Sequence, residues 1–206
     1  MKLIVGLGNP GKEYENTRHN CGFKAIDYYT SKNNLKYKNK FNSEYCEKLI
    51  NNQKIILVKP NTYMNNSGDA VVKFCNYFNI KTSDILIIYD DVDFEIGTFK
   101  IKRTGSSGGH NGIKDIINKL KTEDIPRVRI GISKSNYDMI NYVLGKFSQE
   151  ETKKIDLVVE RVANIIDDFA NNDIEKLMEK YNKKQWLIYY VRNYLILILI
   201  ILRMYL

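Results

Sequence analysis

Short apolar runs recur along the chain and end at glycine, proline or acidic residues, a pattern that predicts buried β-strands. The predicted strands are Lys2 to Leu7, Ser43 to Ile50, Lys54 to Lys59, Ile85 to Tyr89, Thr98 to Lys102 and Val128 to Ser133. Asn51 and Asn52 separate the second strand from the third and predict a hairpin turn. Thr98 to Lys102 alternates apolar and basic side chains, as an edge or half-exposed strand does. The segment YVLGKF, Tyr142 to Phe147, is interpreted as a further strand.

Between the strands, apolar side chains recur three and four positions apart, which predicts amphipathic helices. The predicted helices contain Cys21 to Tyr29, Ala70 to Phe78, Ile113 to Leu120 and Ile155 to Phe169, and a last one begins at Asp173. Ser148 and Glu151 match a capping box that opens the fourth. This alternation predicts an α/β fold: one three-layer domain whose twisted, mixed and largely parallel sheet is flanked by helices.

The 206 residues include only 3 prolines and 12 glycines, so no long linker divides the chain. We expect one domain over residues 1–186, followed by an apolar C-terminal extension, 187–206. Its uninterrupted apolar run, Tyr194 to Leu202, is shorter than the roughly 20 residues of a membrane-spanning helix. An interfacial anchor, an extra core element and an extension without selected function all remain open; we favour the last and expect no membrane association.

Composition narrows the class of protein only a little. Lys and Arg outnumber Asp and Glu by 32 to 24, a net charge of +8 that is compatible with a nucleic-acid partner. Because the excess is modest, a lysine-rich surface encoded by an AT-rich genome is the favoured explanation on charge alone. Cys21, Cys46 and Cys75 are odd in number and widely spaced, which argues against a disulfide framework and a zinc site. Met1 and Lys2 lead directly into a strand, so we expect no signal peptide and a cytoplasmic protein.

Polar loops follow three predicted strands. They are Gly8 to Asn20, Asn61 to Gly68 and Asp90 to Asp93, and the glycine-rich Gly105 to Asn111 precedes a helix nearby. In α/β sheets ligands bind at the carboxyl ends of strands. These loops therefore predict one shared site.

Two familiar patterns in these loops do not fit their usual functions. Gly6, Gly8 and Gly11 spell the dinucleotide-binding G-x-G-x-x-G, but no apolar-periodic helix follows directly. Ser107 lies in a G-x-S-x-G sequence, but the only later histidine, His110, is three residues away and cannot complete a triad. We therefore expect no nucleotide cofactor and no serine nucleophile; the glycines and serines of this loop better suit a phosphate at a helix N-terminus.

His19 lies in the polar loop after the first predicted strand, Asp90 follows the end of another, and the two together suit a hydrolytic site. A histidine beside a carboxylate can take a proton from water, which typically accelerates a reaction about 10²- to 10⁴-fold. Asn9, Asn65 and Asn111 add amide donors for a developing oxyanion, although turn or cap chemistry explains each one better when it is taken alone. Asp91 and Asp93 are alternative carboxylates, and a structural role beside the glycine turn is favoured for His110.

Five segments together resemble the successive motifs of bacterial peptidyl-tRNA hydrolase. They are GLGNPGKEYENTRHNCGF, KPNTYMNNSG, YDDVD, IKRTGSSGGHNG and RVRIGIS. They fall in the family's order and cover about residues 2–146, with a compatible helical end to about residue 185. The resemblance implies an esterase that frees tRNA from peptides released prematurely by stalled ribosomes. It also implies a single α/β domain that is monomeric and needs no metal or cofactor, with no stable protein partner.

By the same resemblance, His19 matches the family's catalytic base and Asp90 its supporting carboxylate. Asn9 matches the asparagine that helps distinguish peptidyl-tRNA from unblocked aminoacyl-tRNA. Met64 matches a residue of the peptide groove. The other positions that match substrate contacts are Tyr14, Tyr63, Asn65 and Asn111, and those that match a clamp on the tRNA 5′-phosphate are Lys102 and Arg129.

One position departs from the family pattern. Asp138 stands where relatives often have a lysine, and Lys134 lies some way earlier. We expect Arg103 and Lys134 to join the phosphate clamp. Two other function classes stay open: a nicotinamide or flavin enzyme, and a tRNA-binding protein without catalysis.

Overall fold

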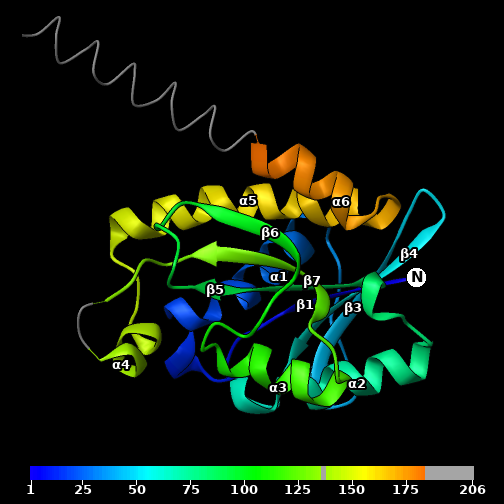
Figure 1. The fold of residues 1–206 in the computed structure, drawn as a ribbon, viewed down its shortest axis with the longest axis horizontal. Helices are drawn as coiled ribbons and strands as arrows, with labels where there is room; N and C mark the ends of the chain where they lie inside the picture. The colour runs from blue at the N-terminus through cyan, green and yellow to red at the C-terminus, as the bar shows by residue number, and fades with distance from the viewer. Residues whose placement is uncertain (136–137, 184–206) are drawn as a thin grey trace, which may run out of the picture.

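The computed structural model of the protein describes residues 1–135 and 138–183. These residues form a mixed, largely parallel sheet in the order β2-β3-β4-β1-β5-β7-β6 (Figure 1). The strands are β1 (Lys2–Gly6), β2 (Lys38–Asn39), β3 (Ser43–Ile50), β4 (Gln53–Pro60), β5 (Ile85–Asp91), β6 (Phe99–Thr104) and β7 (Asp124–Gly131). Adjacent pairs of β4, β1, β5 and β7 run parallel, whereas β2, β3 and β6 pair antiparallel.

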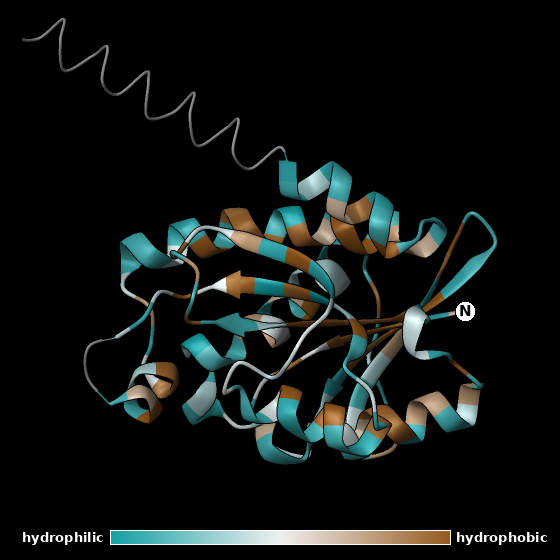
Figure 2. Ribbon diagram, viewed as in Figure 1, coloured by the Kyte–Doolittle hydropathy of each residue, from teal (hydrophilic) through white to brown (hydrophobic). Residues whose placement is uncertain are grey.

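Helices cover both faces of this sheet. They are α1 (Cys21–Lys32), α2 (Ser67–Phe78), α3 (Asn111–Leu120), α4 (Met139–Leu144), α5 (Gln149–Asn171) and α6 (Ile174–Leu177). Short 3₁₀ turns are η1 (Lys12–Tyr14), η2 (Arg18–Asn20), η3 (Met64–Asn66) and η4 (Thr82–Asp84), and η5 (Met178–Asn182) is a π-helical turn. Apolar side chains of α1, α5 and α6 pack on one face and those of α2 and α3 on the other. In Figure 2 the hydrophobic colour accordingly gathers on the strands between the helical layers.

The predicted fold class is confirmed, and most predicted elements lie within a few residues of their expected bounds. Asn51 and Asn52 both have positive φ, 47° and 67°, as a tight hairpin turn between β3 and β4 requires. The capping box of Ser148 and Glu151 is present at the start of α5. Asp173 caps α6 through its side chain. The apolar periodicity, together with the turn and cap residues, therefore predicted these elements correctly.

The prediction of a strand at Tyr142 to Phe147 is wrong. Helix α4 occupies its first half, and the carboxylate of Asp138 caps this helix by accepting the Ile140 N–H. The apolar run is too short for its period to distinguish a strand from a helix. Only one isolated bridge, between Thr17 and Lys146, has strand character here. The unexpected aspartate at 138 thus has a structural explanation.

The predicted C-terminal extension, residues 187–206, and the domain boundary before it lie outside the described residues. Among the residues that are described, none of the helices has both the length and the apolar character needed to cross a membrane.

The close packing of α1 against the sheet positions the loop that precedes it. A Cβ on Gly22 would lie 2.3 Å from both Leu7 N and Ile88 O, so only glycine allows this approach. The Phe23 N–H donates to Leu7 O, which fixes the first turn of α1 at the end of β1. Turn η2, which carries His19, ends where α1 begins. The histidine is therefore held at the carboxyl edge of β1 and β5.

Candidate active site

His19 and Asp90 meet at the carboxyl edge of the central strands. Asp90 is the penultimate residue of β5 and is 2% exposed, and His19 is 9% exposed. The Nδ1 atom of His19 lies 3.0 Å from Oδ1 and 2.9 Å from Oδ2 of Asp90. The structure thus brings together the two side chains that the sequence predicted as a pair.

This contact determines the tautomer of His19. A buried carboxylate can only accept, so Nδ1 carries the proton and Nε2 keeps a free lone pair. Burial by itself would lower the pKa of His19, but the charge of Asp90 and its hydrogen bond outweigh burial and raise that pKa. The ring is therefore a stronger base than an ordinary histidine.

His110 contacts the same carboxylate from the start of α3. Its Nδ1 accepts the Ile113 N–H at 3.2 Å, which makes His110 the N-cap of α3 and leaves the proton on Nε2. Nε2 lies 3.2 Å from Asp90 Oδ1. Burial opposes ionisation of Asp90, but the two imidazoles hold the pKa of this carboxyl below its usual value. The structural role expected of His110 is present, and its contact with Asp90 was not anticipated.

A cavity of about 410 Å³ opens beside this cluster. His19, Asp90 and His110 line it, together with Lys134 and the α4 side chain of Ile140. The proposed base and carboxylate therefore share one opening. Lys134, predicted as a phosphate contact, also faces this opening.

Arg18, the residue before His19, connects the loop that carries His19 to α4 and α5. Its guanidinium donates to Glu151 at 3.0 Å and to Lys146 O at 3.0 Å, and it lies 4.3 Å from the ring centroid of Tyr142. The sequence analysis did not single out Arg18 because its partners are more than 120 residues away. Its position directly before the candidate base was the only available signal.

Asn9 is held from two directions in the first loop. Its side-chain Oδ1 accepts the Met64 N–H at 2.8 Å, so its Nδ2 group is the donor that remains. Asn20 clamps the Asn9 backbone: Asn20 Oδ1 accepts the Asn9 N–H at 2.8 Å, and Asn20 Nδ2 donates to Asn9 O at 3.0 Å. The sequence analysis missed this role of Asn20, although the residue directly follows His19.

Asn65 and Asn111 are both exposed and line a second polar cavity of about 260 Å³. Asn111 also lines the cavity beside His19, so it connects the two. The next residue, Gly112, lets the start of α3 pack closely on Met64, since a Cβ there would lie 2.6 Å from Met64 Sδ. Tyr14 and Tyr63 form an edge-to-face pair, with ring centroids 6.4 Å apart.

Of the residues predicted to bind the tRNA phosphate, some are exposed and others are already paired with carboxylates. Lys102 is exposed on β6 and shares a face of the sheet with Arg129, because Lys100 pairs with Arg129 in register and alternate residues point the same way. Arg129, however, bonds to Asp91 and lies 3.5 Å from Asp93. Arg103 pairs with Asp124 and Glu175. Asp91 is thus engaged by an arginine, which leaves Asp90 as the partner of His19.

His19, Asp90 and His110 are also the residues that come nearest to a metal site in the described part of the chain. Their potential ligand atoms lie within 4.8 Å of one another. The Asp90 carboxylate already accepts from both rings, and His110 Nδ1 is engaged by the backbone. We therefore interpret the group as a hydrogen-bonded cluster.

Comparison with known proteins gives consistent matches. The family model described as peptidyl-tRNA hydrolase matches residues 3–187. The chain is 46% identical to a peptidyl-tRNA hydrolase of Clostridium botulinum over 183 residues, 88% of this chain and 96% of the relative. It is 45% identical to that of Clostridium acetobutylicum, covering 98% of the relative. The crystal structure of peptidyl-tRNA hydrolase from Acinetobacter baumannii superposes with a TM-score of 0.84 at 33% identity, covering 88% of this chain and 94% of that one.

Proposed function

Since the chain belongs to the peptidyl-tRNA hydrolase family and is a hydrolase, we propose that it cleaves the ester between a peptide carboxyl group and the 3′-terminal ribose of tRNA. Cleavage would release peptide and free tRNA, and so recycle tRNA from peptides released prematurely. The observation that carries the mechanism is the His19–Asp90 pair, 2.9 Å apart at the mouth of a cavity. We also expect a cytoplasmic monomer that needs no metal or cofactor.

In the proposed reaction, Nε2 of neutral His19 takes a proton from water as the water oxygen attacks the ester carbonyl. The imidazolium that forms is stabilised by the Asp90 carboxylate, an interaction strengthened by burial. His110 supports this carboxylate from its other side. When the tetrahedral intermediate collapses, the imidazolium returns the proton to the departing ribose oxygen.

Amide groups supply the remaining polar contacts. The side-chain Nδ2 of Asn9 takes no part in the bond with Met64, and we propose that it binds the amide that blocks the esterified amino acid, which is the first peptide bond of a longer peptide. Asn65 and Asn111 are candidates for oxyanion donors, a role in which the loss of one donor costs about 10²-fold or more. Tyr14, Tyr63 and Met64 would contact the substrate beside them.

The test of this function is a comparison of N-acetylated and free aminoacyl-tRNA as substrates. We expect the N-acetylated ester to be cleaved and the free one to be spared. If neither ester is cleaved, the remaining candidate is a tRNA-binding protein without catalysis. A rise in Tm on addition of NAD(P)H would instead favour a cofactor-dependent enzyme.

Binding of the tRNA part of the substrate should weaken as the salt concentration rises. We propose that Lys102, Arg129 and Lys134 contact phosphates, and each such contact releases counterions. Lys102→Ala is expected to raise KM for full-length substrate and to reduce the slope of log KM against log salt concentration by about one. Lys153→Ala, an exposed lysine on α5, is the matched control and should leave both values unchanged. A wild-type KM that does not respond to ionic strength would refute the clamp.

A further inference from the structure

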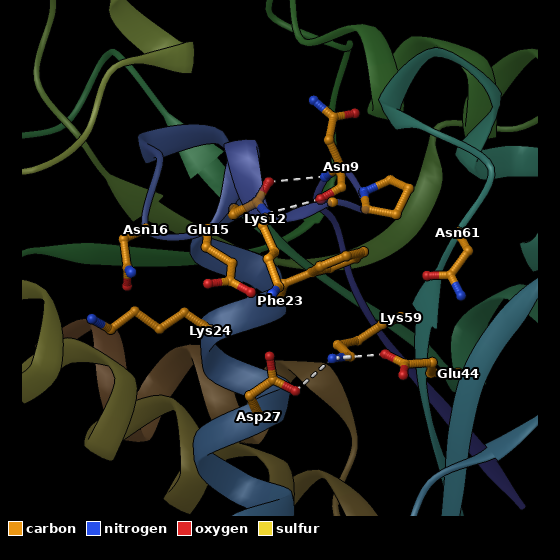
Figure 3. Close-up of a pocket in the computed structure, with 13 residues that line it drawn as sticks. Asn9, Lys12, Glu15, Asn16, Phe23, Lys24, Asp27, Glu44, Lys59 and Asn61 are labelled. Carbon is orange, nitrogen blue, oxygen red and sulfur yellow. Dashed lines mark hydrogen bonds and ion pairs between the residues drawn. The ribbon is translucent and has the colours of Figure 1, made fainter.

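A larger cavity, about 730 Å³, lies beside the Asn9 backbone. The side-chain amide of Asn9 points away from this cavity (Figure 3). Its walls come from the loops after β1 and β4, from the first turns of α1 and from the start of β3. His19 does not line it, but the loop residue Asn9 and its clamp Asn20 do. Nothing in the mechanism above uses this space.

The cavity contains an unbalanced charge cluster. Lys59, at the end of β4, has a side chain only 10% exposed, and its Nζ lies 2.6 Å from Asp27 Oδ1 and 2.9 Å from Glu44 Oε2. Figure 3 shows the two carboxylates converging on this lysine from α1 and β3. One ammonium therefore serves two carboxylates that stay 49% and 39% exposed. The Tyr37 hydroxyl also donates to Asp27 Oδ1, at 2.6 Å. The second oxygen of each carboxylate, Asp27 Oδ2 and Glu44 Oε1, has no bond within the described residues and can accept from a second cation.

The neighbouring charges do not cancel this surplus. Lys24 lines the cavity, but its ammonium lies 2.8 Å from Asp156. Lys12 and Glu15, also in the lining, offset each other. The cluster thus keeps one net negative charge, which suits a cationic group on a ligand.

The topology of the sheet relates this cavity to the candidate active site. The loop after β1 carries Asn9 on one side and this cavity on the other, and the loop after β4 carries Asn61 before Met64 and Asn65. In strand order, β4 lies on one side of β1, whereas β7 and β6, with the candidate phosphate clamp, lie on the other side of β5. The substrate has a peptide on one side of its ester and tRNA on the other. With the ester at His19 and the tRNA over β7 and β6, the peptide extends in the opposite direction, toward β4 and the cavity.

We propose that this cavity binds the amino end of the peptide arm, and that Asp27 and Glu44 receive the free α-ammonium of a short peptidyl-tRNA. The proposal rests on the proposed function. Hydrogen bonds between an ammonium and carboxylates are charge-assisted and short. Because each extended residue spans about 3.3–3.6 Å, the contact requires an arm long enough to pass Asn9.

The test compares peptidyl-tRNAs with arms of two, three and four alanines, each with a free or an N-acetylated amino end. The measured quantity is the ratio of kcat/KM for the free form to kcat/KM for the acetylated form. We expect a ratio of about three in the wild type for at least one length, as for a half-exposed ion pair. The ratio should fall as ionic strength rises, because salt screens such a pair.

Glu44→Gln keeps the size of the side chain and an acceptor for Lys59, and should bring the ratio close to one. Glu160→Gln, an exposed carboxylate on α5, is the matched control and should keep the wild-type ratio. Asp27→Asn is the second variant if Glu44→Gln fails to fold. A wild-type ratio of one or below at every length, or an undiminished ratio in folded Glu44→Gln, would overturn the proposal. N-acetyl-alanyl-tRNA separates the two failures: if the wild type does not cleave it, the proposed function itself is wrong.

Discussion

Replacement of His19 by alanine is expected to lower kcat for peptidyl-tRNA cleavage by about 10²- to 10⁴-fold, the usual contribution of a general base. The Nε2 lone pair is lost, and neither His110 ring nitrogen substitutes for it: Nδ1 accepts the Ile113 N–H and Nε2 donates to Asp90. KM should change little, because the candidate phosphate contacts lie on other elements. Single-turnover cleavage of N-acetyl-aminoacyl-tRNA, with filter binding of the same tRNA, separates the two quantities.

The control for this experiment is His110→Ala. It removes a cap of α3 and one hydrogen bond to Asp90 but leaves the pair of His19 and Asp90, so a loss of tenfold or less is expected. The His19 variant leaves a buried carboxylate with one donor fewer, at a cost of about 1–3 kcal/mol in unfolding free energy. Both variants should therefore be assayed well below their Tm. Equal losses of kcat in the two would contradict the assignment of His19 as the base.

Asp90→Asn is expected to move the rising limb of the pH–rate profile to lower pH and to lower its plateau about 10²-fold. His19 acts as a base only when neutral, so kcat/KM rises as the pH passes the pKa of His19. Asp90 raises this pKa, and removing its charge lets burial lower the pKa again. The plateau falls because the imidazolium formed in the transition state loses its counter-charge. Measuring kcat/KM between about pH 5 and 9 covers the limb.

His110→Asn is the matched control for the pH experiment. Asparagine is a good N-cap, so α3 is kept while the Nε2 donor to Asp90 is lost. Because the carboxylate keeps its charge, the limb should move much less than in Asp90→Asn. A limb that stays in place or moves to higher pH in Asp90→Asn would show that another group raises the pKa of His19.

The pairing of His19 with Asp90 was predictable because β1 and β5 are short apolar runs, and the side chains that follow such strands meet at one edge of a parallel sheet. Which aspartate faces the histidine was not predictable from the pattern. Successive residues of a strand point to opposite faces, so Asp90 and Asp91 cannot both face it. The family resemblance favoured Asp90, and the structure places Asp91 against Arg129.

The residues that sequence reasoning missed act through partners distant in the chain or through the backbone. Arg18 bonds across more than 120 residues, and no local pattern marks such a contact. Asn20 bonds backbone atoms of Asn9, which any short loop of polar residues could do. The strand at Tyr142 was wrongly predicted for a similar reason. Only the side-chain cap of Asp138 on the backbone distinguishes a short helix from an extended segment there.

Every residue of β5, Asp90 included, is buried, and the strand is paired with β1 and β7 on its two sides. The carboxylate cannot leave its place unless the middle of the sheet opens, and such central strands open only with the whole molecule. Irreversible loss of the Asp90 site on heating should consequently track global melting of the sheet. Residual activity after heating then counts the molecules that have kept, or regained, their native sheet.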